Sequence, residues 1–248
     1  MTAPAVTVKV DTSSGDIMKL FASGAFSALP VLDDEGRLAG VVSTTDVVRK
    51  VVASSEGSSA RASDLMTSPA IVAKPGEPLD DAAWRLVAAR AHRLVVVDGD
   101  EPIGVLSIRD VLGGLLHRAA PQPIRTIMSR PVETVEVGDS IAKAIHCLAY
   151  AGVHGLVVLD GARPVGVFTH AEALAARHLP PLLLEDPVEE VMSYETICFD
   201  GATPIDRVAA SAATMNVRRV LVVEDKQLAG IVSDVDVVDA LSRSGTDV

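Results

Sequence analysis

The same order of apolar and polar positions returns four times along the chain. Branched apolar runs that end in an acidic residue lie at 28–33, 93–98, 155–160 and 219–224. After a short polar turn, each run is followed by an apolar stretch that leads into a glycine-led motif, at 40–46, 104–110, 166–172 and 230–236. Apolar runs bounded by Gly, Asp and Pro predict buried strands, and the short turns predict that each pair forms a hairpin.

Helices are predicted on both sides of these hairpins. Apolar residues recur at helical spacing in 78–91, 139–152 and 203–216, and a short helix is predicted after each glycine-led motif. Trp84 lies beside the main apolar face of its helix, and we expect it to pack in the core or at an interface. Segments with a methionine and a short β-like stretch precede three of the helices, at 64–77, 126–139 and 190–202. The opening of the first unit, 6–24, lacks such a segment.

The glycine-led motifs read GVVSTTD, GVLSIRD, GVFTHAE and GIVSDVD, with their glycines at 40, 104, 166 and 230. This near-constant period predicts four repeats, each with the order strand, helix, strand, strand, helix. We place the repeats at 1–54, 61–117, 121–179 and 185–243, joined by linkers at 51–60, 117–123 and 178–186. A single copy of the motif is explained by a capping box, in which the hydroxyl and the acid close the first turn of a helix.

Composition narrows the possible partners. The chain has 248 residues and a net charge of −11, which argues against a nucleic acid or an anionic membrane surface as partner. Cys147 and Cys198 are far apart, lack metal-ligand spacing and lie in apolar stretches, so we expect buried free thiols. No apolar run is long enough to span a membrane, and residues 1–10 lack the features of a signal peptide, so we expect a cytoplasmic protein.

The repeats resemble the CBS domain, the regulatory module named after cystathionine β-synthase, over essentially the whole chain. The resemblance depends on the order of elements, on HRLVVVD at 92–98 and on the four glycine-led motifs. It implies an α+β fold of four tandem β-α-β-β-α repeats that pair into two Bateman modules. It also implies that clefts between paired repeats bind AMP, ADP, ATP or a related adenosyl ligand. Two modules form a disc within one chain or between two chains, so a homodimer stays open.

The acid of each motif is a candidate for the hydroxyls of a ribose, because a carboxylate accepts hydrogen bonds from both. These acids are Asp46, Asp110, Glu172 and Asp236. The Glu172 side chain is one methylene longer than that of Asp, so its carboxylate would be displaced from the position at which an Asp binds the ribose. The hydroxyl three residues earlier lies at a helix N-terminus, where a phosphate is favoured. These hydroxyls belong to Ser43, Ser107, Thr169 and Ser233.

The residues just before the second strand of a repeat are the second group of candidate binding residues. Relatives use this position to meet phosphates, and the candidates are His92, Arg93, His154, Arg218 and Arg219. Arg130 is a further phosphate candidate, whereas the first repeat has Ser27 and Ala28 at this position and supplies no cation. The resemblance places adenine against the opening strands, at Pro69, Ala70, Ile71, Pro131, Val132, Thr196 and Ile197.

These sets predict a regulatory protein without catalysis. The second and fourth repeats carry both the motif and the cations, so we expect one or two nucleotide sites there. No nucleophile–base set and no metal-ligand spacing is present, including at His146, His154 and His170. The resulting hypothesis is a stand-alone sensor that acts on a separate protein partner, because the four repeats use up the chain. Two alternatives are a non-binding scaffold for dimerisation and a ligand-gated signalling adaptor.

Overall fold

The computed structural model describes residues 1–23, 26–52, 59–177, 179–225 and 227–244. It confirms a mixed α+β fold with four small sheets of three strands each. Most of the predicted linker 51–60, the predicted end of the first repeat at residue 54 and residue 178 of the last linker lie outside the described residues.

The elements of the first half follow the predicted order. Repeat 1 contains β1 (Val8–Lys9), α1 (Ser14–Ala22), β2 (Ala28–Leu32), β3 (Leu38–Ser43), α2 (Thr44–Val47) and the π-helical turn η1 (Val48–Val52). Repeat 2 contains α3 (Ala62–Leu65), β4 (Val72–Ala73), α4 (Leu79–Ala88), β5 (Arg93–Asp98), β6 (Glu101–Ser107) and α5 (Ile108–Leu115).

The second half repeats this order. Repeat 3 contains η2 (Ile124–Thr126), β7 (Thr134–Glu136), α6 (Ile141–Tyr150), β8 (Gly155–Asp160), β9 (Arg163–Thr169) and α7 (His170–Ala176). Repeat 4 contains η3 (Pro181–Glu185), η4 (Val188–Glu190), β10 (Cys198–Asp200), α8 (Ile205–Thr214), β11 (Arg219–Glu224), β12 (Gln227–Ser233) and α9 (Asp234–Ser244).

All four sheets share one topology. The short first strand runs parallel to the second, and the second and third strands form the antiparallel hairpin that the apolar runs predict. The hairpin register shifts at the same place in every repeat, for example between Val31 and Leu32 and between Val96 and Val97. The four repeats are therefore equivalent down to the irregularities of their hydrogen bonding.

The amphipathic helices bury the faces that their spacing predicts. In α4, the side chains of Ala82, Ala83 and Leu86 are buried. Trp84 on the same helix is 70% exposed, so the prediction that it packs in the core or at an interface within the chain is wrong. Both cysteines are free thiols, but Cys198 is exposed, which contradicts the expectation of two buried thiols.

Repeats 1 and 2 are joined by a reciprocal exchange of short segments. Thr67 of repeat 2 forms a β-bridge with Val41 of β3, and Thr2 of repeat 1 forms a β-bridge with Val105 of β6. The segment that begins at Met1 thus takes the same place as the segment that contains Met66. The prediction that the first repeat lacks a methionine-containing segment is therefore wrong. Repeats 3 and 4 are joined in the same way, through the bridges Val167–Ser193 and Ser129–Ile231.

These bridges explain the glycine that opens each motif. A Cβ at Gly40 would lie 2.7 Å from the backbone oxygen of Thr67 and 2.9 Å from the Met66 Sδ. A Cβ at Gly104 would lie 3.0 Å from the Met1 Sδ, and Gly166 and Gly230 face Met192 and Met128 in the same way. A side chain at these positions would force the bridging segment away from the hairpin. Methionine and glycine, separated in sequence, form one contact in the fold.

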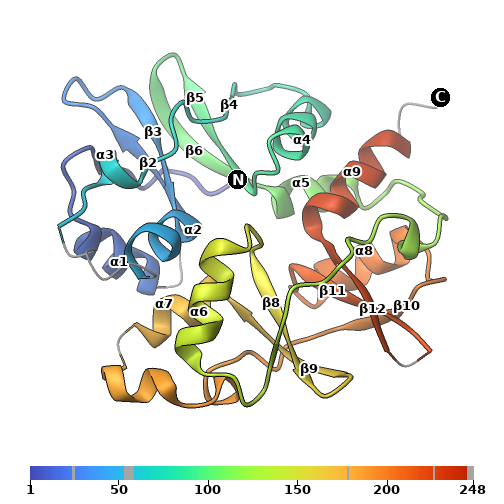
Figure 1. Cartoon of the computed structure of the whole chain (residues 1–248). Helices are drawn as coiled ribbons and strands as arrows, with labels where there is room; N and C mark the ends of the chain where they lie inside the picture. Colours follow the sequence, from blue (N-terminus) through green and yellow to red (C-terminus); the bar gives the residue numbers. More distant parts are fainter. Residues whose placement is uncertain (24–25, 53–58, 178, 226, 245–248) are drawn as a thin grey trace.

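Helices join the two pairs of repeats into a single body (Figure 1). Leu86 of α4 and Leu112 of α5 share a core with Val208 of α8 and Val238 of α9, which packs repeat 2 against repeat 4. Leu174 of repeat 3 is buried in the core of repeat 1, and Val48 of repeat 1 is buried in the core of repeat 3. The four repeats therefore form a closed ring in the spatial order 1–2–4–3.

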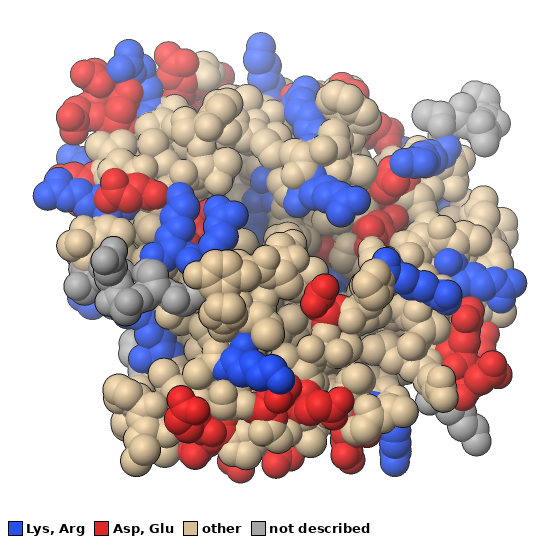
Figure 2. Space-filling model, viewed as in Figure 1, with Lys and Arg blue, Asp and Glu red and all other residues tan. Residues whose placement is uncertain are grey.

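The surface carries charges of both signs. Figure 2 shows acidic and basic side chains interspersed on the face that it displays. Of the helices that the structure describes, none combines the length and the apolar character needed to cross a lipid bilayer.

Candidate functional site

A cavity of about 1010 Å³ lies where the four repeats meet. The first turns of α2 and α7, the starts of β5 and β11 and the segments before β4 and β10 all contribute to its wall. Its volume is at the upper end of the range for small-molecule pockets in proteins. The ring of repeats thus encloses a space that no single module forms alone.

All four hydroxyl–acid pairs form capping boxes. The Asp46 Oδ2 accepts a hydrogen bond from the Ser43 hydroxyl at 2.6 Å and a second one from the Ser43 backbone N–H at 2.9 Å. The boxes Ser107–Asp110, Thr169–Glu172 and Ser233–Asp236 have the same geometry. In each box a single carboxylate oxygen accepts both bonds. Capping a helix therefore leaves the second oxygen of the acid available to another donor.

Only two of these four pairs face the central cavity. Ser43 with Asp46 and Thr169 with Glu172 line its wall. Ser107, Asp110, Ser233 and Asp236 are not among the residues that line it. The second carboxylate oxygen of Asp110 lies 3.3 Å from the amino group of Met1 instead.

The predicted cations gather in the same cavity. His92, Arg93, His154, Arg218 and Arg219 all line it. Arg130 does not, because its guanidinium lies 3.2 Å from the carboxylate of Glu224, on the hairpin of repeat 4. Five of the six candidate cations for a phosphate are thus brought together, although they come from three different repeats.

The predicted adenine-binding residues are divided between two locations. Pro69, Ile71 and Thr196 line the cavity. Ala70, Pro131, Val132 and Ile197 do not line it.

At the cavity, the arginine at the start of β5 or β11 contacts the neighbouring repeat. Arg93 of repeat 2 donates a hydrogen bond to Ser27 of repeat 1, and Arg219 of repeat 4 lies against Gly155 of repeat 3, where a Cβ would be 3.5 Å from its guanidinium carbon. The missing cation of repeat 1 is therefore supplied by its partner. Sequence reasoning combined each acid with the cations of its own repeat, which is why it ranked repeats 2 and 4 first.

Three histidines form a cluster at the cavity. The ring centroids of His92 and His154 are 4.4 Å apart, and those of His154 and His170 are 5.8 Å apart. Burial, with the nearby His92 and Arg219, lowers the pKa of His154 to about 3. Burial, with the nearby Arg219, lowers the pKa of His170 to about 4. At neutral pH, His154 and His170 are therefore uncharged hydrogen-bonding groups.

The arginines keep their charge in this environment. Burial, with the nearby Arg218, lowers the pKa of Arg93 to about 10, and burial lowers the pKa of Arg219. Asp234 opposes both shifts through its negative charge. The cavity wall therefore contains two guanidinium groups that can donate charge-assisted hydrogen bonds.

Sequence reasoning missed several residues of this site. Ser27, His170, Glu195 and Asp234 lie in or beside the cavity and were not predicted as binding residues. A signal exists for two of them, because the position after the motif hydroxyl holds Thr44, Ile108, His170 and Asp234 in the four repeats. Only two repeats carry a titratable side chain there.

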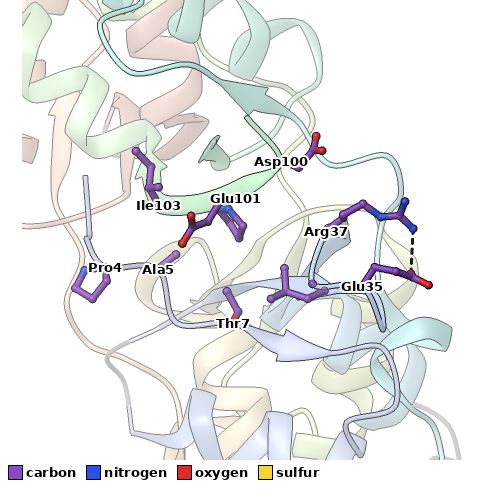
Figure 3. A pocket seen from close by; sticks show the side chains of 11 residues that line it. Pro4, Ala5, Thr7, Glu35, Arg37, Asp100, Glu101 and Ile103 are labelled. Carbon is purple, nitrogen blue, oxygen red and sulfur yellow. Dashed lines mark hydrogen bonds and ion pairs between the residues drawn. The ribbon is translucent and has the colours of Figure 1, made fainter. Parts of the chain in front are cut away.

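A second hollow of about 620 Å³ lies between the hairpins of repeats 1 and 2 (Figure 3). Arg37 and Glu35 form an ion pair of 3.0 Å on one side of it, and Glu101 points toward it from β6. None of the predicted binding residues lines it. In the part of the chain that the structure describes, no group of three or more His, Cys, Asp or Glu side chains is placed to hold a metal ion.

Comparison with known families identifies the family to which the four repeats belong. The model of the CBS domain matches four segments of the chain, at residues 1–53, 62–117, 124–179 and 188–243. The chain belongs to the CBS-domain family. The capping boxes and the central cavity are therefore features of four CBS domains arranged as two Bateman modules.

Solved structures of CBS proteins share the fold over almost the full chain. The crystal structure of protein MJ1225 from Methanocaldococcus jannaschii, which its description proposes as an archaeal homolog of g-AMPK, has a TM-score of 0.85 at 18% identity and covers 96% of each chain. A conserved protein from Pyrococcus horikoshii has a TM-score of 0.66 at 21% identity and covers 97% of each chain. At these identities the likeness establishes the fold alone.

Curated relatives of this CBS protein match part of its length. A 33.4 kDa protein from a ribosomal RNA operon of Thermofilum pendens is 26% identical over 172 residues, which are 64% of this chain. The inosine-5'-monophosphate dehydrogenase of Methanocaldococcus jannaschii is 27% identical over 154 residues, which are 62% of this chain. The match covers 57% of the first relative and 29% of the second.

Proposed function

We propose that this CBS protein is a non-catalytic sensor that binds an adenine nucleotide in its central cavity and signals to a separate protein partner. The observation that carries the proposal is the composite cavity, in which the motif acids of two repeats and the arginines of the other two line one space. Asp46 of repeat 1 and Glu172 of repeat 3 line it together with Arg93 of repeat 2 and Arg219 of repeat 4. Two half-sites of this kind match a ligand with a ribose at one end and a phosphate at the other.

The chemistry of each part supports a nucleotide. Asp46 and Glu172 line the cavity, and each has a carboxylate oxygen outside its capping box that can accept from ribose hydroxyls. In Asp46 this oxygen lies 3.7 Å from the Arg49 guanidinium. Arg93 and Arg219 supply positive charge for phosphate oxygens, and His154 supplies one neutral N–H donor. Pro69 and Ile71 offer an apolar surface to a base. Since two of the motif acids line the cavity, we propose one or two bound nucleotides per chain.

Titration calorimetry with AMP, ADP and ATP tests the proposal. We expect the double variant Asp46→Ala, Glu172→Ala to lose affinity by about tenfold or more, because each substitution removes an acceptor for the ribose hydroxyls. The double variant Asp110→Ala, Asp236→Ala is a matched control. It removes the same type of capping box from two other helices, and neither acid lines the cavity.

The outcomes separate the sensor from a scaffold. Under the proposal, the control loses stability through its caps yet keeps nucleotide binding. Absence of binding heat with all three nucleotides in the natural sequence would support the scaffold instead. The scaffold is the second candidate because every motif acid already has a structural role in its cap.

A further inference from the structure

Asp234 is a buried acid at the edge of the central cavity. It is the first residue of α9 and only 5% of its surface is exposed. The equivalent positions of the other repeats hold Thr44, Ile108 and His170, so repeat 4 alone carries a carboxylate there. The motif of the repeat does not require an acid at this position, and its presence calls for a separate explanation.

The carboxylate of Asp234 is only partly paired. Its Oδ1 lies 3.4 Å from the His92 Nδ1 and accepts the backbone N–H of Val235 at 3.1 Å. Its Oδ2 is buried and has no hydrogen-bond partner among the described residues. A buried carboxylate with an unpartnered oxygen is destabilising by itself, so it needs compensation from nearby positive charge.

The compensating charges are the arginines of the cavity. The negative charge of Asp234 acts on both Arg93 and Arg219. Its own backbone N–H donates to the carbonyl of Arg218 at 3.1 Å, which ties α9 to the start of β11. The acid is therefore held close to the groups that are expected to meet the phosphates.

Counting charges shows what this acid changes. Four arginines line the cavity, namely Arg90, Arg93, Arg218 and Arg219, and three carboxylates line it, namely Asp46, Glu172 and Glu195. Asp234 behind the wall adds a fourth negative charge, so positive and negative charges balance. Each additional phosphate charge of a ligand then meets a cavity without a surplus of positive charge, and the repulsion from Asp234 grows with the number of phosphates.

We propose that Asp234 is a specificity-determining residue, a built-in counter-ion that makes the cavity favour a nucleoside monophosphate over a triphosphate. This inference rests on the proposed function, since it assigns a preference among nucleotides to the same cavity. The carboxylate lies beside the cavity, where its negative charge offsets that of Arg93 and Arg219, which would otherwise bind a second or third phosphate.

Calorimetry in buffer without divalent cations tests the assignment on the full chain. In the natural sequence, AMP is expected to bind more tightly than ATP. In Asp234→Asn, which keeps the size of the side chain and removes its charge, the ratio of ATP affinity to AMP affinity is expected to rise about tenfold or more. Asp239→Asn is the matched control, because Asp239 lies on the same helix and pairs with Arg243 at 2.7 Å, and its ratio should not change.

A second variant guards against failure to fold. Asp234→Thr introduces the residue that repeat 1 carries at the equivalent position, and circular dichroism checks the fold of each variant. An unchanged ratio in a folded variant, or tighter binding of ATP than of AMP by the natural sequence, overturns the role of Asp234 and leaves nucleotide sensing intact. Absence of heat with both nucleotides in the natural sequence overturns the proposed function and this inference together.

Discussion

His154 and His170 show how the closed ring changes the chemistry of single residues. Both have pKa values far below that of a histidine in water, at about 3 and about 4. Burial is the largest cause for each, and Arg219 adds repulsion. His92 also faces both rings, and Asp234 partly offsets the shift at His154. An isolated repeat would leave these side chains in water, so the shifts depend on the assembled cavity.

A loss of stability on mild acidification follows from these pKa values. Between the folded values and about 6.5, the unfolded chain binds more protons than the folded chain, so stability falls as the pH falls through this window. Each histidine is expected to destabilise the fold by about 2 kcal/mol at pH 5 relative to pH 7. Thermal or urea unfolding at several pH values measures the effect.

Neutral replacements provide the control for this prediction. His154→Gln and His170→Gln should each reduce the loss between pH 7 and pH 5, since glutamine does not titrate. His146→Gln should leave it unchanged, because His146 is exposed on α6. Equal pH dependence in all four proteins would show that the cavity histidines are not responsible.

At the scale of elements, the sequence predicts the repeat but not its connections. Continuous apolar runs and amphipathic stretches place most strands and helices, since both patterns reflect burial within one repeat. The bridge between Thr2 and Val105 joins residues that are far apart in sequence. No local pattern around Met1 marks it as the counterpart of Met66, so the sequence predicts that the first repeat lacks this segment. Such pairings depend on how two repeats dock.

The contact between glycine and methionine is expected to limit substitution. Gly40→Ala would place a Cβ 2.7 Å from the backbone oxygen of Thr67, which cannot rotate away. We expect a destabilisation of about 1–3 kcal/mol from this overpacking, measured by chemical denaturation. Gly113→Ala is the control, because that position in α5 has no atom within 4 Å of an added Cβ. Alanine there should be neutral or stabilising by up to about 1 kcal/mol. Equal behaviour of both variants would contradict the proposed role of Gly40.

At the scale of the whole molecule, the candidate site combines residues of different repeats, whereas the sequence prediction combined residues of the same repeat. Most of the residue types were foreseen, because the motifs and the cations repeat with the fold. The sequence could not show that Asp46 and Arg93 line one cavity while Asp110 does not line it. That division arises from the order 1–2–4–3 around the ring, which is a property of docking between repeats. Asp234 is not predicted from the sequence for the same reason, since the His92 side chain that it contacts belongs to repeat 2.

Because helices of both modules share one core, the two modules are expected to unfold together. Leu241 of α9 is fully buried in the core that repeat 4 shares with repeat 2. Leu241→Ala should destabilise the protein by about 2–5 kcal/mol through the lost burial and the cavity left behind. Hydrogen exchange should then show reduced protection in α4 and α5 as well as in α9, because repeat 2 loses its support from α9.

Leu156→Ala is the comparison, since Leu156 is equally buried but belongs to the separate core of repeat 3. In Leu156→Ala, hydrogen-exchange protection should fall first in β7, β8 and α6. Protection in α4 and α5 should fall only as far as the global stability does. Two separate unfolding transitions in the natural sequence, with α4 and α5 unaffected by Leu241→Ala, would contradict a shared core. A single transition that moves to a lower denaturant concentration in Leu241→Ala would support the shared core. The central cavity would then depend on the docking of the two modules, because residues of all four repeats line it.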